Sequence, residues 1–270
     1  MLRTSVKKLV APFYYKALDI YDAVFHSDIE FLPPRGLRFV GNGDFIKTGN
    51  EFVEYFINKA GLKPEHQVLD VGCGIGRMAI PLTKYLNKEG SFEGFDIAEK
   101  GIEWCRKNIT PKYPNFRFQV ADLYNKLYHP KGKYADTEYK FPYDGNSFDF
   151  IYLTSVFTHM LPGGVENYML EISRVLKPGG KCLITFFILN EESEQLIKDG
   201  KSVFNFKSDY DIYRLQNEEV PEDAIAYKED YLKDLFNKNS LQMEEPVHYG
   251  SWCGRNNYLS FQDIVIAEKR

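Results

Sequence analysis

The chain has 270 residues, a formal net charge of −4, 44% hydrophobic residues and 27% charged residues. These values are typical of a globular protein that buries a substantial core. They argue against a nucleic-acid binder, which needs a basic block, and the chain contains no run of about 18 apolar residues to span a bilayer.

The four cysteines (Cys73, Cys105, Cys182 and Cys253) lie far apart and include no C-x-x-C pair. This spacing argues against both a structural zinc site and a disulfide framework. It is typical of a reducing compartment, so we expect a cytoplasmic protein without a resident metal ion.

The first predicted element is an amphipathic helix, indicated by apolar residues at helical spacing from Val6 to Val24. Pro12 and Asp19 interrupt its apolar run, which excludes a signal peptide. We expect the apolar stripe to pack on the body of the protein. Contact of this basic helix with a membrane surface is the alternative.

From residue 67 onward, β-branched or aromatic runs alternate with helical patterns. This alternation predicts an α/β fold with βαβ units and a mostly parallel sheet that has helices on both faces. A final pair of runs has no helix between its members and predicts a hairpin. The predicted strands are Val68–Val71, Phe92–Ile97, Phe116–Val120, Phe148–Val156 and Cys182–Leu189, the helices are Met78–Leu86, Ile102–Ile109 and Val165–Leu176, and the hairpin strands are Met243–Trp252 and Ser260–Ala267.

Two segments lie outside this alternation of strand and helix patterns. Residues 1–60, whose second helical pattern ends at Gly61, are expected to form a helical extension or lid on a domain of residues 61–270. Glu191–Glu245 holds 15 acidic and 7 basic residues, and its aromatic side chains argue against disorder. We expect a cap insertion at about 190–227, with Phe45, Tyr210 and Tyr213 lining an acceptor pocket.

Three glycines, Gly72, Gly74 and Gly76, follow a predicted strand that contains Asp70. Such a turn opens a crevice at the carboxyl end of the sheet, where doubly wound sheets bind ligands, and a turn without a ligand is the alternative. Asp96 ends the next strand, 20 residues after Gly76, where a carboxylate accepts hydrogen bonds from both hydroxyls of a ribose. Nicotinamide dinucleotides and S-adenosylmethionine both carry a ribose, but the G-x-G-x-G spacing departs from the G-x-G-x-x-G of dinucleotide sites.

At these residues the chain resembles the class I S-adenosylmethionine-dependent methyltransferases. "VLDVGCGIGR" and "GFDIA" resemble the family's first two motifs, "VADL" the segment after strand three, and "FDFIYLTSVFTHM" strand four with its loop. "EISRVLKPGGKCLITFF" resembles the helix, turn and fifth strand, and "QDIVIAEK" the antiparallel last strand. The resemblance implies a Rossmann-like, seven-stranded, mostly parallel sheet with an antiparallel last strand, and S-adenosyl-L-methionine as the cofactor.

The resemblance also implies a role for each matching residue. The alternative for Ile97 and Leu123 is ordinary core packing, and the alternative for Asp122 is a helix cap. The implied cofactor contacts are Asp70, Gly72, Gly74 and Gly76 at the methionine end, Asp96 at the ribose, Ile97, Asp122 and Leu123 at the adenine, and Thr154 and Ser155 beside the sulfonium.

His159 is the predicted catalytic base. It follows the predicted fourth strand at the mouth of the crevice, and an imidazole titrates near neutrality. A histidine that only orients the loop is the alternative. His66 precedes the first strand at the opposite edge of the sheet, whereas His248, in the predicted hairpin, is a second candidate.

The acceptor is predicted only by class. Nucleic-acid amino-methylating enzymes of this fold carry Asp or Asn followed by Pro-Pro-Tyr after strand four, where this chain reads Leu153-Thr154-Ser155-Val156. The acidic insertion would also repel a phosphate backbone. We therefore expect a small-molecule or glycan-type acceptor, with O-methylation favoured over N-methylation, no nucleic-acid partner and no integral membrane association; the sequence leaves the oligomeric state open.

Two rivals from other classes stay open at this point. A dinucleotide oxidoreductase would need a phosphate-binding turn that the glycine spacing does not provide. A non-catalytic S-adenosylmethionine-binding scaffold or regulatory protein would keep the glycines and Asp96 but would need no base at His159.

Overall fold

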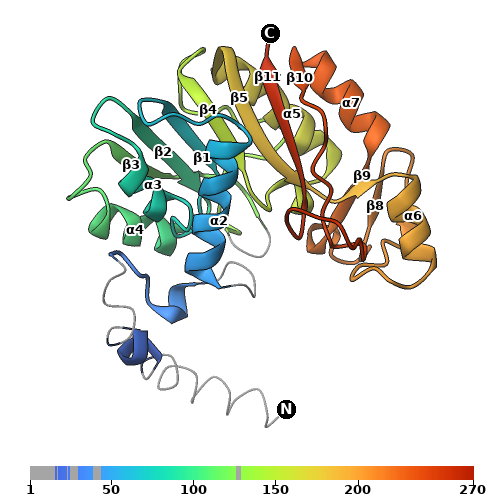
Figure 1. Ribbon diagram of the computed structural model, residues 1–270, viewed down its shortest axis with the longest axis horizontal. Coiled ribbons are helices and arrows are strands. Elements are labelled where there is room, and N and C mark those ends of the chain that lie inside the picture. The colour runs from blue at the N-terminus through green and yellow to red at the C-terminus, as the bar shows by residue number, and fades with distance from the viewer. Residues whose placement is uncertain (1–15, 17, 23, 25–29, 39–43, 126–128) are drawn as a thin grey trace.

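The computed structural model describes residues 16, 18–22, 24, 30–38, 44–125 and 129–270, which contain a seven-stranded sheet (Figure 1). Its strand order is β10-β11-β5-β4-β1-β2-β3. Strands β1 to β5 pair in parallel, whereas β11 runs antiparallel to both of its neighbours, β10 and β5, as predicted. The strands are β1 (Gln67–Val71), β2 (Ser91–Asp96), β3 (Phe116–Val120), β4 (Phe148–Leu153), β5 (Leu176–Phe186), β10 (Leu241–Met243) and β11 (Asp263–Lys269).

Helices cover both faces of this sheet, and the side chains of β4 show how. Phe150 and Tyr152 are buried in the core under α2, α3 and α4, whereas Ile151 and Leu153 are buried in the core under α5 and α7. This alternation is the period of a strand buried on both faces. The helices are α2 (Phe45–Asn58), α3 (Ala79–Tyr85), α4 (Glu99–Asn108), α5 (Pro162–Val175) and α7 (Glu229–Lys238).

Helix α2 begins at Phe45, seven residues before Phe52, the first residue of the apolar helical pattern that ends at Gly61. The Asp44 carboxylate accepts hydrogen bonds from the backbone N–H groups of Ile46 (3.0 Å) and Lys47 (2.9 Å), which is an N-cap. Most of the predicted N-terminal amphipathic helix lies outside the described residues; of its length, residue 16, residues 18–22 and residue 24 are helical. None of the helices that the structure describes has the length and hydrophobicity needed to cross a bilayer.

A second, four-stranded sheet with the order β6-β9-β8-β7 lies between β5 and α7 along the chain. It is joined to α6 (Glu191–Lys198) and occupies the side of the main sheet where β5 ends and β11 begins (Figure 1). The sequence did not predict these strands, because runs of two to four residues are too short to show a period of two. They are β6 (Ile188–Leu189), β7 (Ser208–Asp209), β8 (Tyr213–Leu215) and β9 (Ile225–Lys228).

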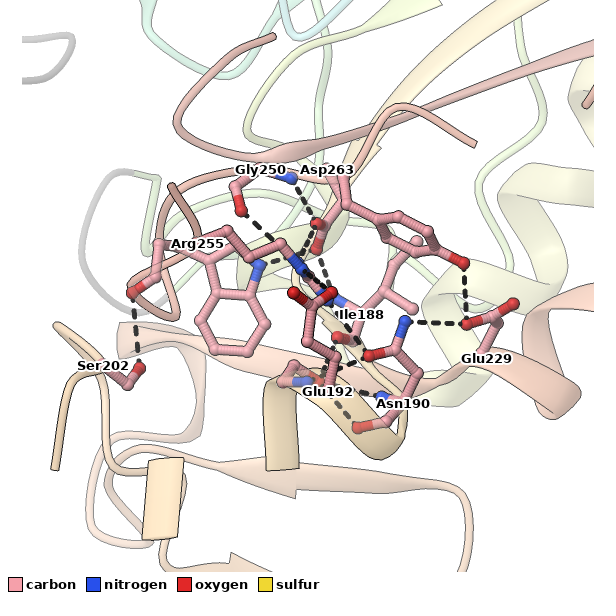
Figure 2. Close-up of polar contacts among 11 residues, drawn as sticks. Ile188, Asn190, Glu192, Ser202, Glu229, Gly250, Arg255 and Asp263 are labelled. Carbon is pink, nitrogen blue, oxygen red and sulfur yellow. Dashed lines mark hydrogen bonds and ion pairs between the residues drawn. The ribbon is translucent and has the colours of Figure 1, made fainter. Parts of the chain in front are cut away.

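A buried carboxylate fastens this second sheet to the first (Figure 2). Asp263, the first residue of β11, is fully buried and accepts hydrogen bonds from the backbone N–H groups of Ile188 and Gly250, both at 2.6 Å. It also accepts from the Trp252 indole N–H at 2.6 Å and from the Arg255 guanidinium at 3.2 Å. One side chain therefore holds together β11, β6 and the loop between β10 and β11.

Arg255 extends the contact to α6. Its guanidinium donates to the Asn190 side-chain oxygen (3.0 Å) and to the Glu192 carboxylate (2.7 Å), at the first turn of that helix. We call these residues, together with the four partners of Asp263 and Asp263 itself, the Asp263 network. Its buried ion pair is completed by further hydrogen bonds, the condition under which a buried charge is tolerated.

Candidate active site

The glycine turn follows β1 and lies at the carboxyl edge of the sheet. Gly72, Gly74 and Gly76 have φ angles of +83°, +55° and +75°, a region that glycine adopts without steric cost. A Cβ atom added at Gly72 would lie 2.5 Å from Cγ2 of Val156, so the loop after β4 closes directly on the turn. The positive φ angles and this close contact explain why the turn is built from glycine.

Asp96, at the end of β2, is held rigidly beside this turn. Its Oδ2 accepts the Gly74 N–H and its Oδ1 accepts the Ala98 N–H, both at 2.7 Å. Burial raises the pKa of the carboxyl above its ordinary value, and the backbone N–H donors oppose that shift. Since a carboxylate has about four acceptor positions, both oxygens keep capacity for the two hydroxyls of a ribose.

Asp70 lies on the neighbouring strand and is almost completely buried. Its carboxyl group has a hydrogen bond with the Tyr152 hydroxyl, and Oδ1 has no other partner among the residues that the structure describes. Burial raises its pKa well above the ordinary value and the nearby Asp96 charge acts in the same direction, whereas the Tyr152 hydrogen bond and the Arg77 charge oppose that shift. The acceptor capacity that this bond leaves unfilled fits a cationic ligand group, such as the ammonium of an S-adenosylmethionine molecule.

The adenine-side candidates come from β2 and from the segment after β3. Ile97 is half-buried, and Leu123 is buried and forms an isolated bridge with Tyr134. The half-buried Asp122 carboxylate accepts the backbone N–H of Lys133 at 3.2 Å. Within the described residues no α-helix follows Asp122 before α5, so the structure gives no support to the helix-cap alternative.

The loop after β4 brings together residues that the sequence did not connect. Ser155 has a φ of +59°, a strained value for a residue with a side chain. Its N–H donates to Thr185 Oγ1 (2.8 Å), and its hydroxyl donates to Gln262 Oε1 (3.0 Å). Thr154 precedes it and is half-buried, so both predicted sulfonium neighbours lie at the carboxyl ends of the strands.

His159 is exposed at the end of the short helix η2 (Phe157–His159). Its Nδ1 lies 2.8 Å from the backbone carbonyl oxygen of Glu222, which belongs to η3 (Pro221–Asp223) of the insertion. Because a carbonyl only accepts, Nδ1 carries the proton, and in the neutral ring Nε2 is then an acceptor. The contact is consistent with an oriented base and also with a loop tether, so the catalytic role remains a prediction.

The three aromatic candidates for the acceptor pocket lie on α2 and in the insertion. Phe45 is buried at the start of α2, with the Arg38 guanidinium 5.7 Å from its ring centre. Tyr210 and Tyr213 stack on each other, with ring centres 4.6 Å apart and ring planes 5° from parallel. Tyr210 stays exposed, so its outer ring face is available to a ligand.

A cavity of about 570 Å³ lies elsewhere, among residues at the amino ends of the strands. Gln67, Ser91 and Phe148, the first residues of β1, β2 and β4, line it. None of the predicted cofactor contacts is among its lining residues. Since ligands of doubly wound sheets bind at the carboxyl edge, the glycine turn, and not this cavity, remains the predicted cofactor site.

The fold and this edge define a Rossmann-like domain with a nucleoside-binding turn. Residues 62–240 match the family model described as "Methyltransferase domain", and the chain belongs to that family. Its family is that of the class I S-adenosylmethionine-dependent methyltransferases, whose cofactor is S-adenosyl-L-methionine.

Several curated methyltransferases are similar in sequence to this chain. The chain is 24% identical to a sterol 24-C-methyltransferase of Schizosaccharomyces pombe over 197 residues, which is 73% of this chain and 46% of that protein. It is 28% identical over 182 residues to phosphoethanolamine N-methyltransferase 3 of Arabidopsis thaliana (66% of this chain, 32% of that protein). The chain thus spans about half, or less, of the length of these two relatives.

Solved structures agree on the fold. A methyltransferase of Methanosarcina mazei matches 79% of this chain and 96% of its own, with a TM-score of 0.53 and 20% identity. The 1,6-didemethyltoxoflavin-N1-methyltransferase of Burkholderia thailandensis, solved with S-adenosylhomocysteine, matches 94% of this chain and 89% of its own, with a TM-score of 0.52 and 14% identity.

Proposed function

We propose that the protein methylates a small-molecule or sugar-bearing acceptor, preferentially on oxygen, with His159 as the general base. The observation that carries this proposal is the contact between His159 Nδ1 and the Glu222 carbonyl, which leaves Nε2 unprotonated in the neutral ring. The insertion that supplies this carbonyl follows β5, at the carboxyl edge, where an acceptor has to approach.

The chemistry requires one proton transfer. The cofactor supplies an electrophilic methyl group on a sulfonium. The sulfonium would give up its methyl group to the acceptor oxygen and keep the electron pair of the broken carbon–sulfur bond as a neutral thioether. His159 Nε2 would take the hydroxyl proton of the acceptor, and positioning of the acceptor would supply the remainder of the rate acceleration.

N-methylation is the second candidate, because the relatives include phosphoethanolamine N-methyltransferases. An amine nucleophile needs the same base once it is an ammonium, so the site serves both reactions. The insertion's acidic character also supports a cationic acceptor over an anionic one.

The test is turnover with methyl-¹³C-labelled S-adenosylmethionine against a panel of alcohols, phenols, sugars and amines. Mass spectrometry detects the product, and the ¹³C chemical shift separates O-methyl, N-methyl and C-methyl groups. We expect His159→Ala to lower kcat by about 10²- to 10⁴-fold while the dissociation constant of S-adenosylhomocysteine stays unchanged. His66→Ala, at the amino edge, is the matched control and should keep wild-type turnover.

Two results would contradict the proposal. If His159→Ala keeps more than roughly a third of the wild-type kcat, catalysis proceeds by positioning alone and His159 is a loop tether. If no member of the panel is methylated although S-adenosylmethionine binds, the non-catalytic binding protein becomes the better hypothesis.

The compartment is proposed on separate grounds. All four cysteines are buried and unpaired. This supports a reducing environment, and with it the proposal of a cytoplasmic protein.

A further inference from the structure

Two buried oxygen atoms face the same side of the sheet and have no hydrogen-bond partner other than each other. Asp70 of β1 and Tyr152 of β4 are direct partners in the parallel register of these strands. The exposed fractions are 2% for Asp70 and 0% for Tyr152. Apart from the hydrogen bond between these two side chains, neither Asp70 Oδ1 nor Tyr152 Oη has a partner in the part of the chain that the structure describes. Buried polar groups normally fill their hydrogen-bonding capacity, so the acceptor positions that this one bond leaves unfilled call for an explanation.

The packing alone does not explain the hydroxyl of Tyr152. Its ring lies against Phe56 of α2, with ring centres 4.3 Å apart, and against Phe150 of the same strand, at 6.1 Å. A phenylalanine would fill the same place without the cost of burying a polar atom. The chain has phenylalanine two residues earlier on the same face of β4, at Phe150, so the hydroxyl of Tyr152 is a specific departure.

The charges around the pair favour a cation. Asp70 and Asp96 contribute two carboxyl groups, and Arg77 is the opposing cation that acts on Asp70. Burial raises the pKa of the Tyr152 hydroxyl, and the charge of Asp70 and the hydrogen bond with Asp70 act in the same direction. The glycine turn that binds the cofactor begins directly after Asp70 and Val71.

We propose that Tyr152 is a cofactor-positioning residue, whose hydroxyl and the Asp70 carboxylate together receive the ammonium of the methionine part of the cofactor. A phenol donates one hydrogen bond and accepts others. Tyr152 donates to the Asp70 carboxylate and accepts one ammonium N–H, while Asp70 Oδ1 accepts another. The proposal rests on the cofactor class, and it adds a residue of β4 to a contact otherwise attributed to the glycine turn.

The test compares two ligands by calorimetry. S-adenosylhomocysteine carries the ammonium, whereas 5′-methylthioadenosine keeps the nucleoside and the sulfur but has neither ammonium nor carboxylate. Tyr152→Phe should weaken S-adenosylhomocysteine binding by about 10- to 100-fold, the equivalent of one hydrogen bond to a charged group, and leave 5′-methylthioadenosine binding unchanged. The matched control is Tyr55→Phe, since Tyr55 lies in the same core and its hydroxyl donates to the Leu259 carbonyl at 2.8 Å. That variant should bind both ligands as the wild type does.

A second ligand separates the ammonium from the carboxylate and needs no variant. An analogue of S-adenosylhomocysteine with hydrogen in place of the amino group should bind the wild type at least about tenfold more weakly than S-adenosylhomocysteine. It should bind wild type and Tyr152→Phe equally.

The proposal is overturned if Tyr152→Phe binds S-adenosylhomocysteine as tightly as the wild type, or if it loses affinity for both ligands alike. Equal loss would mean that the hydroxyl shapes the core and not the ammonium site. If Tyr152→Phe does not fold, equal affinity of the wild type for S-adenosylhomocysteine and its deaminated analogue overturns the proposal on its own. A wild-type protein that binds no S-adenosylhomocysteine would refute the cofactor assignment, and the proposal with it.

Discussion

The Asp96 side chain shows how one carboxylate can serve the fold and the ligand together. Its two bonds to the N–H groups of Gly74 and Ala98 fix the glycine turn to β2. Its remaining acceptor capacity is what we predict the hydroxyls of a ribose to use. A change at this residue should therefore affect binding through both effects.

We expect Asp96→Ala to weaken S-adenosylhomocysteine binding by about 2–3 kcal/mol, which is roughly 30- to 150-fold in Kd. The reason is the loss of charge-assisted acceptors for the ribose hydroxyls. Calorimetry measures the change. Asp96→Asn keeps one side-chain oxygen, so its Kd should lie between that of the wild type and that of Asp96→Ala. An Asp96→Ala protein within threefold of the wild-type Kd would show that the ribose is bound elsewhere.

At the scale of residues, local motifs were predictable and register contacts were not. Asp70, Asp96 and the glycines stand at fixed positions of one βαβ unit, so their proximity follows from the chain order. Tyr152 reaches Asp70 only through the pairing of β1 with β4. Gln262 reaches Ser155 across 107 residues of chain, and no local pattern contains that information.

Among the elements, the second sheet depends on the Asp263 network for its attachment. Its strands are two to four residues long and would have little stability alone. The network places a buried carboxylate where the insertion meets β11. The stability of that junction should therefore vary with the ionisation of Asp263.

Burial raises the pKa of Asp263 from 3.8 to about 6, against the opposing effect of its hydrogen bonds and of Arg255. The folded-state pKa lies above the unfolded one, so this group's contribution to stability is complete below about pH 4 and is lost as the pH rises through 6. The difference corresponds to about 3 kcal/mol. Urea unfolding of Asp263→Asn between pH 4 and pH 7.5 should lack this loss of stability.

The informative quantity is the difference between the two pH profiles, since all other groups titrate in both proteins. Asp263→Asn will be less stable overall, because the amide N–H₂ group faces donors whose hydrogen bonds a carboxylate oxygen accepted in the wild type. Profiles that run parallel across this range would show that Asp263 does not titrate between pH 4 and pH 7.5.

Most regular elements were predictable to within a few residues, and the insertion was predicted by its place alone. Two predictions were wrong by more: β5 begins at Leu176 and not at Cys182, and of the predicted strand Met243–Trp252 only Met243 lies in β10. Runs that are buried on both faces carry enough β-branched and aromatic residues to be recognised, as in Phe148–Leu153. The short strands of the second sheet are specified by contacts such as Ile188 with Asp263. The start of α2 was missed because its signal is a single capping residue, Asp44.

At the scale of the whole molecule, ligand binding should stabilise the fold. S-adenosylhomocysteine at 100 times its Kd should add about 2.7 kcal/mol to the free energy of unfolding. For a chain of this size we expect Tm to rise by about 5–10 °C. Differential scanning fluorimetry measures the shift, and NAD at the same concentration is the control that should leave Tm unchanged. A larger shift with NAD would contradict the cofactor.

The antiparallel direction of β11 has a practical consequence for handling the protein. The strand begins with Asp263 at the edge where the cofactor turn lies and ends with Lys269, whose ammonium contacts the Leu176 carbonyl at the start of β5 (2.7 Å). The C-terminal end of the chain therefore points away from the mouth of the site (Figure 1). An affinity tag, a fluorophore or a surface linkage attached after Arg270 would leave that mouth free for acceptor screening on immobilised protein.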